Sequence, residues 1–270
     1  MTKKSKHNNN WLGLSWLTVL GLVFSTIALG TLSTLANEKR ENNINTPVLF
    51  QPPPGEKPPK DTEGGGSRDE GSSCDRDIAT RSQQIPGTIN KLTAIAPNSY
   101  NGLTTAERPT FWVNLPKTSA PQAILLIKKG SDADWHQLDT HWQQSINLKG
   151  NAGIIGIKLS KDAPVLEIGK NYQWVLALVC GNQPNPNDPL VAAEIKRIDR
   201  SQISRIATTI TELDKASLYA RKGIWYDALD ILVAEKSSLN NWQDIWVKYL
   251  RSGGLSNEIA NEPVRGTLTD

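Results

Sequence analysis

Residues 172–180 read Tyr-Gln-Trp-Val-Leu-Ala-Leu-Val-Cys, and this stretch decides the fold class. Alternate side chains of an extended chain point to opposite faces of a sheet. One face of this stretch therefore carries Tyr172, Trp174, Leu176, Leu178 and Cys180, and the other face is largely apolar after the first turn. A strand that is apolar on both faces is typical of the middle of a packed structure. We expect a central β-strand here.

Similar short apolar runs lie on the N-terminal side of this strand. They cover residues 111–115, 123–129 and 154–159, and Gly, Pro and Asn residues separate them. About seven short strands with such breaks, over about 110 residues, are typical of a β-sandwich. The sequence therefore predicts a mainly β domain over residues 74–199.

The turn that leads into the central strand favours one kind of sandwich. Residues 166–174, Leu-Glu-Ile-Gly-Lys-Asn-Tyr-Gln-Trp, resemble the corner before strand F of immunoglobulin-like and fibronectin type III domains. There a Tyr hydroxyl bonds back to upstream backbone, and Tyr172 takes that place here. Antibody domains carry Cys two residues after the Tyr, whereas this chain has Trp174. A disulfide through Cys180 would then tie the preceding segment to the sandwich rather than bridge its two sheets.

The apolar period becomes helical after Asp199. It predicts helices over residues 203–222, 224–236 and 241–252, with Asn240 capping the third. The third helix places Trp242, Trp246 and Tyr249 on one face, which is typical of a surface that seeks a partner. We expect residues 200–254 to pack on the sandwich and residues 255–270 to form a tail.

Residues 218–229 resemble the turn between the two helices of a tetratricopeptide repeat. Tyr219, Gly223, Trp225 and Ala228 have the spacing of the aromatic, Gly, aromatic and small residues of that repeat. Only one such helix pair is visible, and about three repeats are normally needed for independent stability. The pair is therefore expected to pack on the sandwich or on a partner protein of the cell envelope.

The N-terminal end has the layout of an export signal. Lys3, Lys4 and Lys6 precede a long uncharged apolar run over residues 11–36. This run is either a signal peptide cleaved after Ala36 or an uncleaved anchor in the membrane. In both cases the basic flank sends the remainder outward, to the periplasm or cell envelope.

A linker follows the export signal. Residues 37–73 are rich in Pro and then in Gly, which is typical of a disordered spacer. Val48, Leu49 and Phe50 are too apolar for a spacer, and we expect them to dock on the domain as an edge strand. Without the three N-terminal lysines, 27 basic residues face 27 acidic ones, so the exported part is neutral. A neutral surface argues against nucleic acid as a partner.

The exported part contains two cysteines, Cys74 and Cys180. An oxidising compartment allows such a pair to close, so we expect a disulfide between them. Two unpaired thiols are the alternative.

The densest polar group comprises Asp132, Asp134, His136 and His141. If the chain is extended here and then turns, these oxygen and nitrogen ligands could meet at a metal ion. The alternative interpretation is a solvated hairpin. A hydrolase with an unrecognised site near His136 and His141 would use the same residues.

Patterns of known catalytic sites are absent from the sequence, and so we expect neither enzyme activity nor a cofactor. The exported part has many Trp and few Phe residues. Most of these Trp residues are expected in the core. Trp135 and Trp142 are expected to be exposed, and could stack on sugar rings if the protein is a carbohydrate-binding module.

Several segments together resemble one family. They are residues 50–54 with 64–68, 92–97, 102–107 leading into 109–112, 169–174, and 218–229. Their order and spacing are similar to those of cyanobacterial proteins with the domain of unknown function 928, from about residue 48 to 252. The resemblance implies an exported cyanobacterial protein and supplies no catalytic residues. Our leading hypothesis is a non-enzymatic envelope protein that binds or scaffolds an unknown ligand.

Overall fold

The computed structural model describes residues 47–53, 74, 91–98, 100–130, 137–148, 150, 152–203 and 210–268. All of them belong to the second of two compact units, Ile44–Asp270, whereas the first unit is Met1–Asn43. The expected export signal over residues 11–36 and most of the expected linker lie outside the described residues. Within the described ranges, no helix has both the length and the apolar character needed to cross a membrane.

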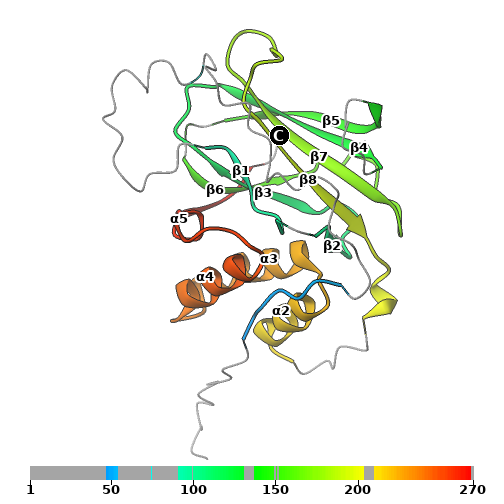
Figure 1. Ribbon diagram of the computed structural model, residues 1–270, viewed down its shortest axis with the longest axis vertical. Helices are drawn as coiled ribbons and strands as arrows, with labels where there is room; N and C mark the ends of the chain where they lie inside the picture. The colour runs from blue at the N-terminus through cyan, green and yellow to red at the C-terminus, as the bar shows by residue number, and fades with distance from the viewer. Residues whose placement is uncertain are drawn as a thin grey trace, which may run out of the picture. The chain divides into compact units, whose positions relative to one another are not determined.

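Two β-sheets make up the larger part of the described chain (Figure 1). In spatial order, the first sheet contains β1 (Thr93–Ala94), β3 (Thr110–Leu115), β6 (Gly153–Lys158) and β9 (Val264–Leu268). The second contains β2 (Gly102–Thr104), β8 (Leu190–Arg197), β7 (Asn171–Val179), β4 (Gln122–Lys129) and β5 (Asp139–Asn147). Most neighbours are antiparallel, while β2 lies parallel to β8 and β9 lies parallel to β6. The predicted mainly β class is therefore confirmed.

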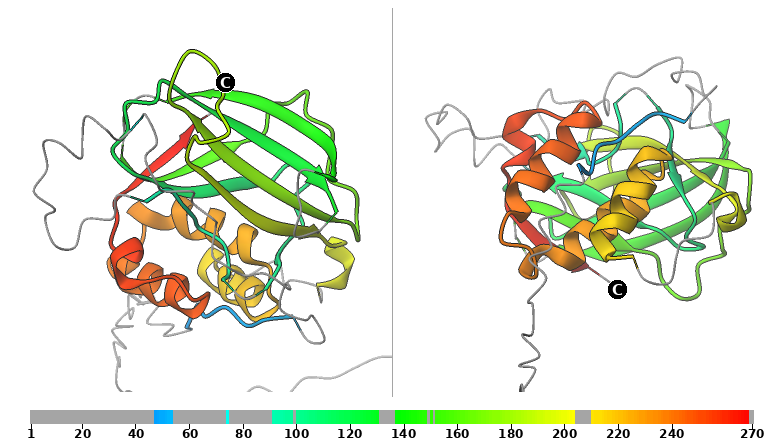
Figure 2. Two further views of the ribbon diagram at one scale, coloured as in Figure 1. Left: turned by 45° about the horizontal axis from the view of Figure 1, so that its top comes forward. Right: turned by 90° about the horizontal axis from the view of Figure 1, so that it is seen from below.

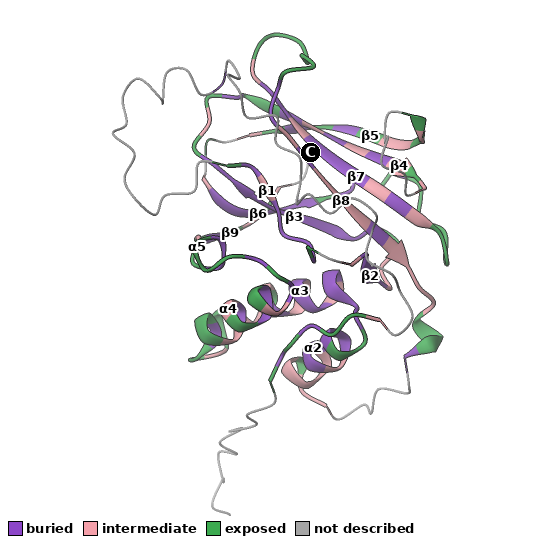
Figure 3. Ribbon diagram, in the orientation of Figure 1, coloured by how far each residue is buried: buried purple, intermediate pink, exposed green. Residues whose placement is uncertain are grey.

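The two sheets share one apolar core. The rings of Phe111 on β3 and Trp174 on β7 lie 5.2 Å apart between their centroids, and both side chains are fully buried. In Figure 3 the buried residues follow the strands of both sheets, whereas the loop after β7 is exposed.

Strand β7 is central in its sheet, as the sequence predicts. It pairs with β8 on one side and with β4 on the other. Tyr172, Trp174 and Leu176 are fully buried on the core face, and Val175 is fully buried on the opposite face. The burial of both faces explains why the segment has no polar alternation.

The C-terminal helices are α2 (Glu212–Arg221), α3 (Trp225–Ala234), α4 (Trp242–Ser252) and α5 (Asn257–Ala260), with short 3-10 turns at Arg200–Gln202 and Glu235–Ser237. Helix α2 begins at residue 212 rather than 203, because Thr211 caps it and exchanges hydrogen bonds with Asp214. This reciprocal capping satisfies donors that a helix start leaves unpaired. The N-cap of α4 is Asn241, one residue after the predicted Asn240.

Helices α2, α3 and α4 form a layer beside the sandwich (Figures 1 and 2). Tyr226 of α3 is the clearest contact, because its hydroxyl accepts the indole N–H of Trp174 at 2.8 Å and donates to the carbonyl of Glu194 at 3.2 Å. Burial raises the pKa of Tyr226 far above its usual value. A C-terminal helical part is thus present beside the two sheets, as predicted.

Residues 255–268 differ from the tail that we expected. They form α5 and strand β9, which pairs with β6 from Val264 opposite Ile154 onward. The Lys236 ammonium donates to the carbonyl of Val264 at 3.0 Å, which ties the strand to the helical layer as well. This short strand has little apolar pattern of its own, so the sequence does not reveal it.

Candidate peptide-binding site

Residues 47–53, which we call the strap, cross the helical layer in an extended conformation. The blue segment in Figure 2 follows this path over the helices. Val48 and Phe50 are 3% and 6% exposed, whereas Leu49 between them is 39% exposed. Alternate strap side chains therefore point into the protein, as in a strand, although no sheet receives them.

The strap is held by main-chain hydrogen bonds to the ends of two helices. The amide of Phe50 donates to the hydroxyl of Ser252 at 2.8 Å, and the amide of Gln51 donates to the carbonyl of Ala220 at 3.0 Å. The hydroxyl of Ser217 donates to the carbonyl of Pro47 at 3.0 Å. The Ala220 carbonyl lies in the last turn of α2 and also accepts the amide of Gly223 at 3.1 Å. A carbonyl oxygen has two lone pairs, so it can accept the strap amide as well.

Phe50 supplies the apolar anchor of the strap. Its ring meets the indole of Trp225 edge-on, with 5.1 Å between the ring centroids. Trp225 is itself fixed, because its N–H donates to the carbonyl of Ile95 at 2.9 Å and its ring stacks on Tyr249 at 4.5 Å. A fully buried Trp that is held on two sides offers a preformed surface to an incoming aromatic ring.

Gly223 allows the close approach of the strap at the α2–α3 turn. Its φ of 73° lies in the left-handed region that favours glycine, and a Cβ there would lie 2.6 Å from Cγ of Pro53. We call the residues that contact the strap the strap site. They are Ser217, Ala220, Gly223, Trp225 and Ser252.

Residues of the predicted tetratricopeptide-like turn supply part of this site. Gly223 and Trp225 contact the strap, while Tyr219 and Ala228 are buried among the helices. Sequence reasoning assigned these four residues a structural role only, and it placed residues 48–50 on a sheet edge. The strap instead docks on the helices, because its N–H groups bond to helix ends and not to a strand.

The aromatic face of α4 is filled within the chain. Trp242, Trp246 and Tyr249 are all buried, and the N–H of Trp242 donates to the carbonyl of Leu232 at 2.6 Å. The hydroxyl of Tyr249 donates to the carbonyl of Trp225 at 2.9 Å. We expected this face to contact a partner protein, but it packs within the chain. Its Tyr249 contacts Trp225.

Two carboxylates on α3, which sequence reasoning did not nominate, fix the helical layer to the sheets. Asp227 accepts from the Thr104 hydroxyl at 2.7 Å and from both the amide and the hydroxyl of Thr105. Asp230 accepts from the indole N–H of Trp112 at 2.7 Å and from the Thr110 hydroxyl at 3.1 Å. Burial raises the pKa of Asp230 to about 6. Acidic residues three apart on a helix that faces a sheet are the signal that could have found them.

The residues predicted to bind metal are only partly described. Asp132, Asp134, Trp135 and His136 lie outside the described residues. Among the described residues, no three His, Cys, Asp or Glu side chains gather in a way that could hold a metal ion. His141 lies at a bulge of β5, with its ring 4.9 Å from that of Tyr172.

Trp142 is half-buried and packs against the core, although we expected it to be exposed. Its indole N–H donates to the side-chain carbonyl of Gln144 at 3.0 Å, and the Gln144 amide donates to the carbonyl of Lys158 at 3.0 Å. This chain of bonds links β5 to the end of β6 across the open edge of the sandwich. Trp142 is thus held in place by partners within the chain.

Tyr172 makes the corner bond that its sequence context predicts. Its hydroxyl accepts the amide N–H of Glu167 at 3.0 Å, which closes the turn before β7. Gly169 sits in this turn with a φ of 78°.

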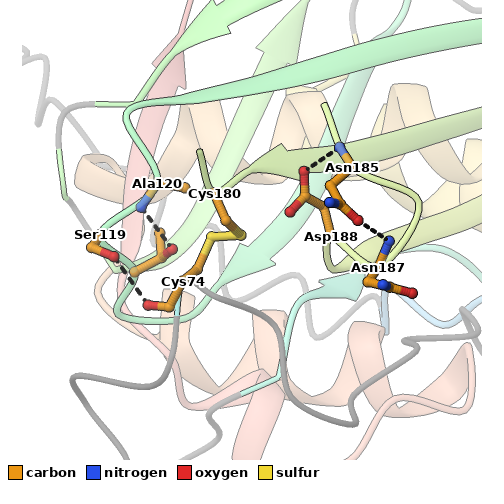
Figure 4. The surroundings of a disulfide bond; sticks show 8 residues. Cys74, Ser119, Ala120, Cys180, Asn185, Asn187 and Asp188 are labelled. Atoms are coloured by element: carbon orange, nitrogen blue, oxygen red, sulfur yellow. Dashed lines mark hydrogen bonds between the residues drawn. A yellow bond between two sulfur atoms is a disulfide. The ribbon is translucent and has the colours of Figure 1, made fainter. Parts of the chain in front are cut away.

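Cys74 and Cys180 form a disulfide, as predicted (Figure 4). Their Cα atoms are 4.8 Å apart, and the Ser119 hydroxyl donates to the carbonyl of Cys74 at 3.0 Å. Cys180 directly follows β7, so the bond joins the segment before the sandwich to the end of its central strand. It fixes the chain at a point 21 residues after Pro53.

Fold and site together define a mainly β protein with an attached helical layer that holds an extended peptide. The sequence model of the family described as Domain of Unknown Function (DUF928) matches residues 63–264. The chain therefore belongs to this family. The match includes the whole strap site and begins after the strap. No curated protein and no solved structure matches the chain.

Proposed function

We propose that this protein is an exported, non-enzymatic envelope protein whose helical layer is a binding or scaffolding module for an extended peptide. The observation that carries the proposal is the strap, which the helices hold through main-chain hydrogen bonds and one buried aromatic ring. Main-chain bonds supply affinity for any extended chain, and pockets for alternate side chains supply specificity. A site that accepts the strap has the chemistry to accept a similar segment of another protein.

The finer fold assignment is part of the proposal. An immunoglobulin- or fibronectin-III-like sandwich is supported by the order β2-β8-β7-β4-β5 opposite β1-β3-β6 and by the corner bond of Tyr172. A tetratricopeptide-like nature of the α2–α3 pair is supported by the left-handed Gly223 and the buried Ala228 at their turn.

Export to the periplasm or cell envelope of a cyanobacterium completes the proposal. It is supported by the basic and apolar N-terminal sequence and by the Cys74–Cys180 disulfide, since structural disulfides persist in oxidising compartments. Residues 11–36 either leave as a signal peptide or remain as a membrane anchor. The mass of the mature protein distinguishes these two outcomes.

Titration of a labelled peptide tests the binding function. The peptide spans residues 46–54, and the receptor is the full chain with Phe50→Ala, whose own strap is weakened. We expect saturable binding by fluorescence anisotropy. A peptide with Phe50→Ala should bind much more weakly, and the matched peptide with Leu49→Ala should bind normally because Leu49 points outward. Equal binding by all three peptides, or no binding at all, would contradict the proposed function.

A further inference from the structure

We propose that the strap site also receives residues 47–53 of a second copy of this chain, so that two copies exchange straps. The inference rests on the proposed function and names the partner. Each copy would then contribute the strap that completes the other copy's site.

The contacts define which peptide fits the site. It needs inward apolar side chains at the positions of Val48 and Phe50. It also needs N–H groups at the positions of Phe50 and Gln51, and a carbonyl at the position of Pro47. The prolines of the strap stand at positions 47, 52 and 53, where no N–H is required. Proline stiffens an extended chain and removes a donor, so this placement suits the site. A second copy supplies this segment by identity, with every contact preserved.

The strap can leave its own site without disturbing the sandwich. Its hydrogen bonds described above all run to α2 and α4, and none belongs to a sheet ladder. The Cys74–Cys180 disulfide holds the chain after the strap, whichever site the strap occupies. Exchange between copies therefore breaks and remakes the same contacts, and chain concentration decides its extent.

The chain between strap and disulfide is long enough for the exchange. Residues 54–73 lie between Pro53 and Cys74. At 3.3–3.6 Å per residue, this length can span at most about 70 Å. A compact unit of the length of Ile44–Asp270 has a radius of gyration of about 17 Å, and this reach exceeds its diameter of about 45 Å. A neighbouring strap site is thus accessible to a strap whose own Cys74 remains bonded.

Disulfide trapping between two differently tagged full-length chains tests the exchange. One chain carries Val48→Cys and the other carries Ser217→Cys, because the Val48 side chain points into the site and the Ser217 hydroxyl lies 3.0 Å from the carbonyl of the peptide bond that precedes Val48. The two chains are coproduced and then mildly oxidised. Neither can close this bond alone, so a crosslinked heterodimer reports a strap in the other chain's site. We expect several times more heterodimer than with the matched control Leu49→Cys, which faces solvent, and Phe50→Ala in the strap-bearing chain should reduce it to the control level.

A single chain with both Val48→Cys and Ser217→Cys separates the two proposals. If this chain closes its internal bond and the mixed chains give no heterodimer above control, strap exchange is overturned and the strap site stands. If neither bond forms, the peptide-binding function falls together with the exchange.

Discussion

Phe50 and Trp225 lie 175 residues apart in the sequence, yet their rings meet edge-on with centroids 5.1 Å apart. This contact joins the strap to the helical layer at the other end of the described chain. Several measurable properties depend on it.

Removal of the Phe50 ring should destabilise the protein. Phe50→Ala exposes the face of Trp225 and loses the burial of a large side chain, so we expect the free energy of unfolding to fall by about 2 kcal/mol. The matched change Leu49→Ala removes an outward side chain and should shift it by less than about 0.5 kcal/mol. Chemical denaturation measures both, and equal losses for the two variants would show that the strap is not anchored through Phe50.

Gly223→Ala should destabilise the protein through two separate effects. The left-handed φ costs about 1 kcal/mol for a residue with a Cβ, and that Cβ would in addition press on Pro53. Gly169→Ala is the control, because Gly169 has a similar φ of 78° with open space around it.

We therefore expect Gly223→Ala to cost more than Gly169→Ala in denaturation experiments. In a background of Phe50→Ala, whose strap is already loosened, the difference between the two glycine variants should shrink. A difference that stays constant would place the extra cost elsewhere than in the strap.

Asp230 should make the protein more stable as the pH falls from 7 towards 5. Its pKa rises from an ordinary 3.8 to about 6 in the folded state, chiefly because burial disfavours the charge. Between these two values the folded state binds more protons than the unfolded state, so the free energy of unfolding increases on acidification. The full effect is about 2 to 3 kcal/mol. Below about pH 4.5, exposed carboxylates whose pKa is lowered, such as Glu167 and Asp199, act in the opposite direction.

Asp230→Asn removes the titrating group while it keeps a similar shape. Denaturation midpoints between pH 5 and 7 should rise on acidification in the parent and stay level in this variant. The same pH dependence in both proteins would assign the effect to another group.

Loss of the disulfide should lower stability strongly. Cys74 and Cys180 are separated by 106 residues, and the chain-entropy estimate for a loop of that length is about 4–5 kcal/mol. We expect the double change to Ser at both positions to lose stability of this order. Mass spectrometry of unreduced peptides checks the bond itself, and alkylation of both cysteines in native material would contradict it.

Much of the fold could be predicted from periodicity and turn chemistry. Strand β7 has apolar residues on both faces, and the Tyr172 corner follows from a local sequence pattern. The Cys74–Cys180 pair was expected from the presence of two cysteines and from the expected export signal. The first two features arise from residues close together in the sequence. The third follows because there are two cysteines and so one possible pair.

The strap site depends on contacts that local patterns do not encode. Residues 48–50 look apolar, but only the fold shows that Trp225 and Ser252 converge on them. In the sequence, Asp227 and Asp230 look like ordinary surface acids of α3. Strand β9 is too short to show a strand pattern in the sequence. In each case the decisive partner lies more than a hundred residues away in the sequence.

The order of strap and disulfide along the chain has a mechanical consequence. A pull on the N-terminal side first meets the hydrogen bonds and the Phe50 ring of the strap, which can peel away and re-form. It next meets the covalent bond at Cys74, which is joined to the end of the central strand. Tension from the N-terminal end therefore loads the strap contacts first and the disulfide second, and the disulfide passes it to the end of β7 rather than to β1.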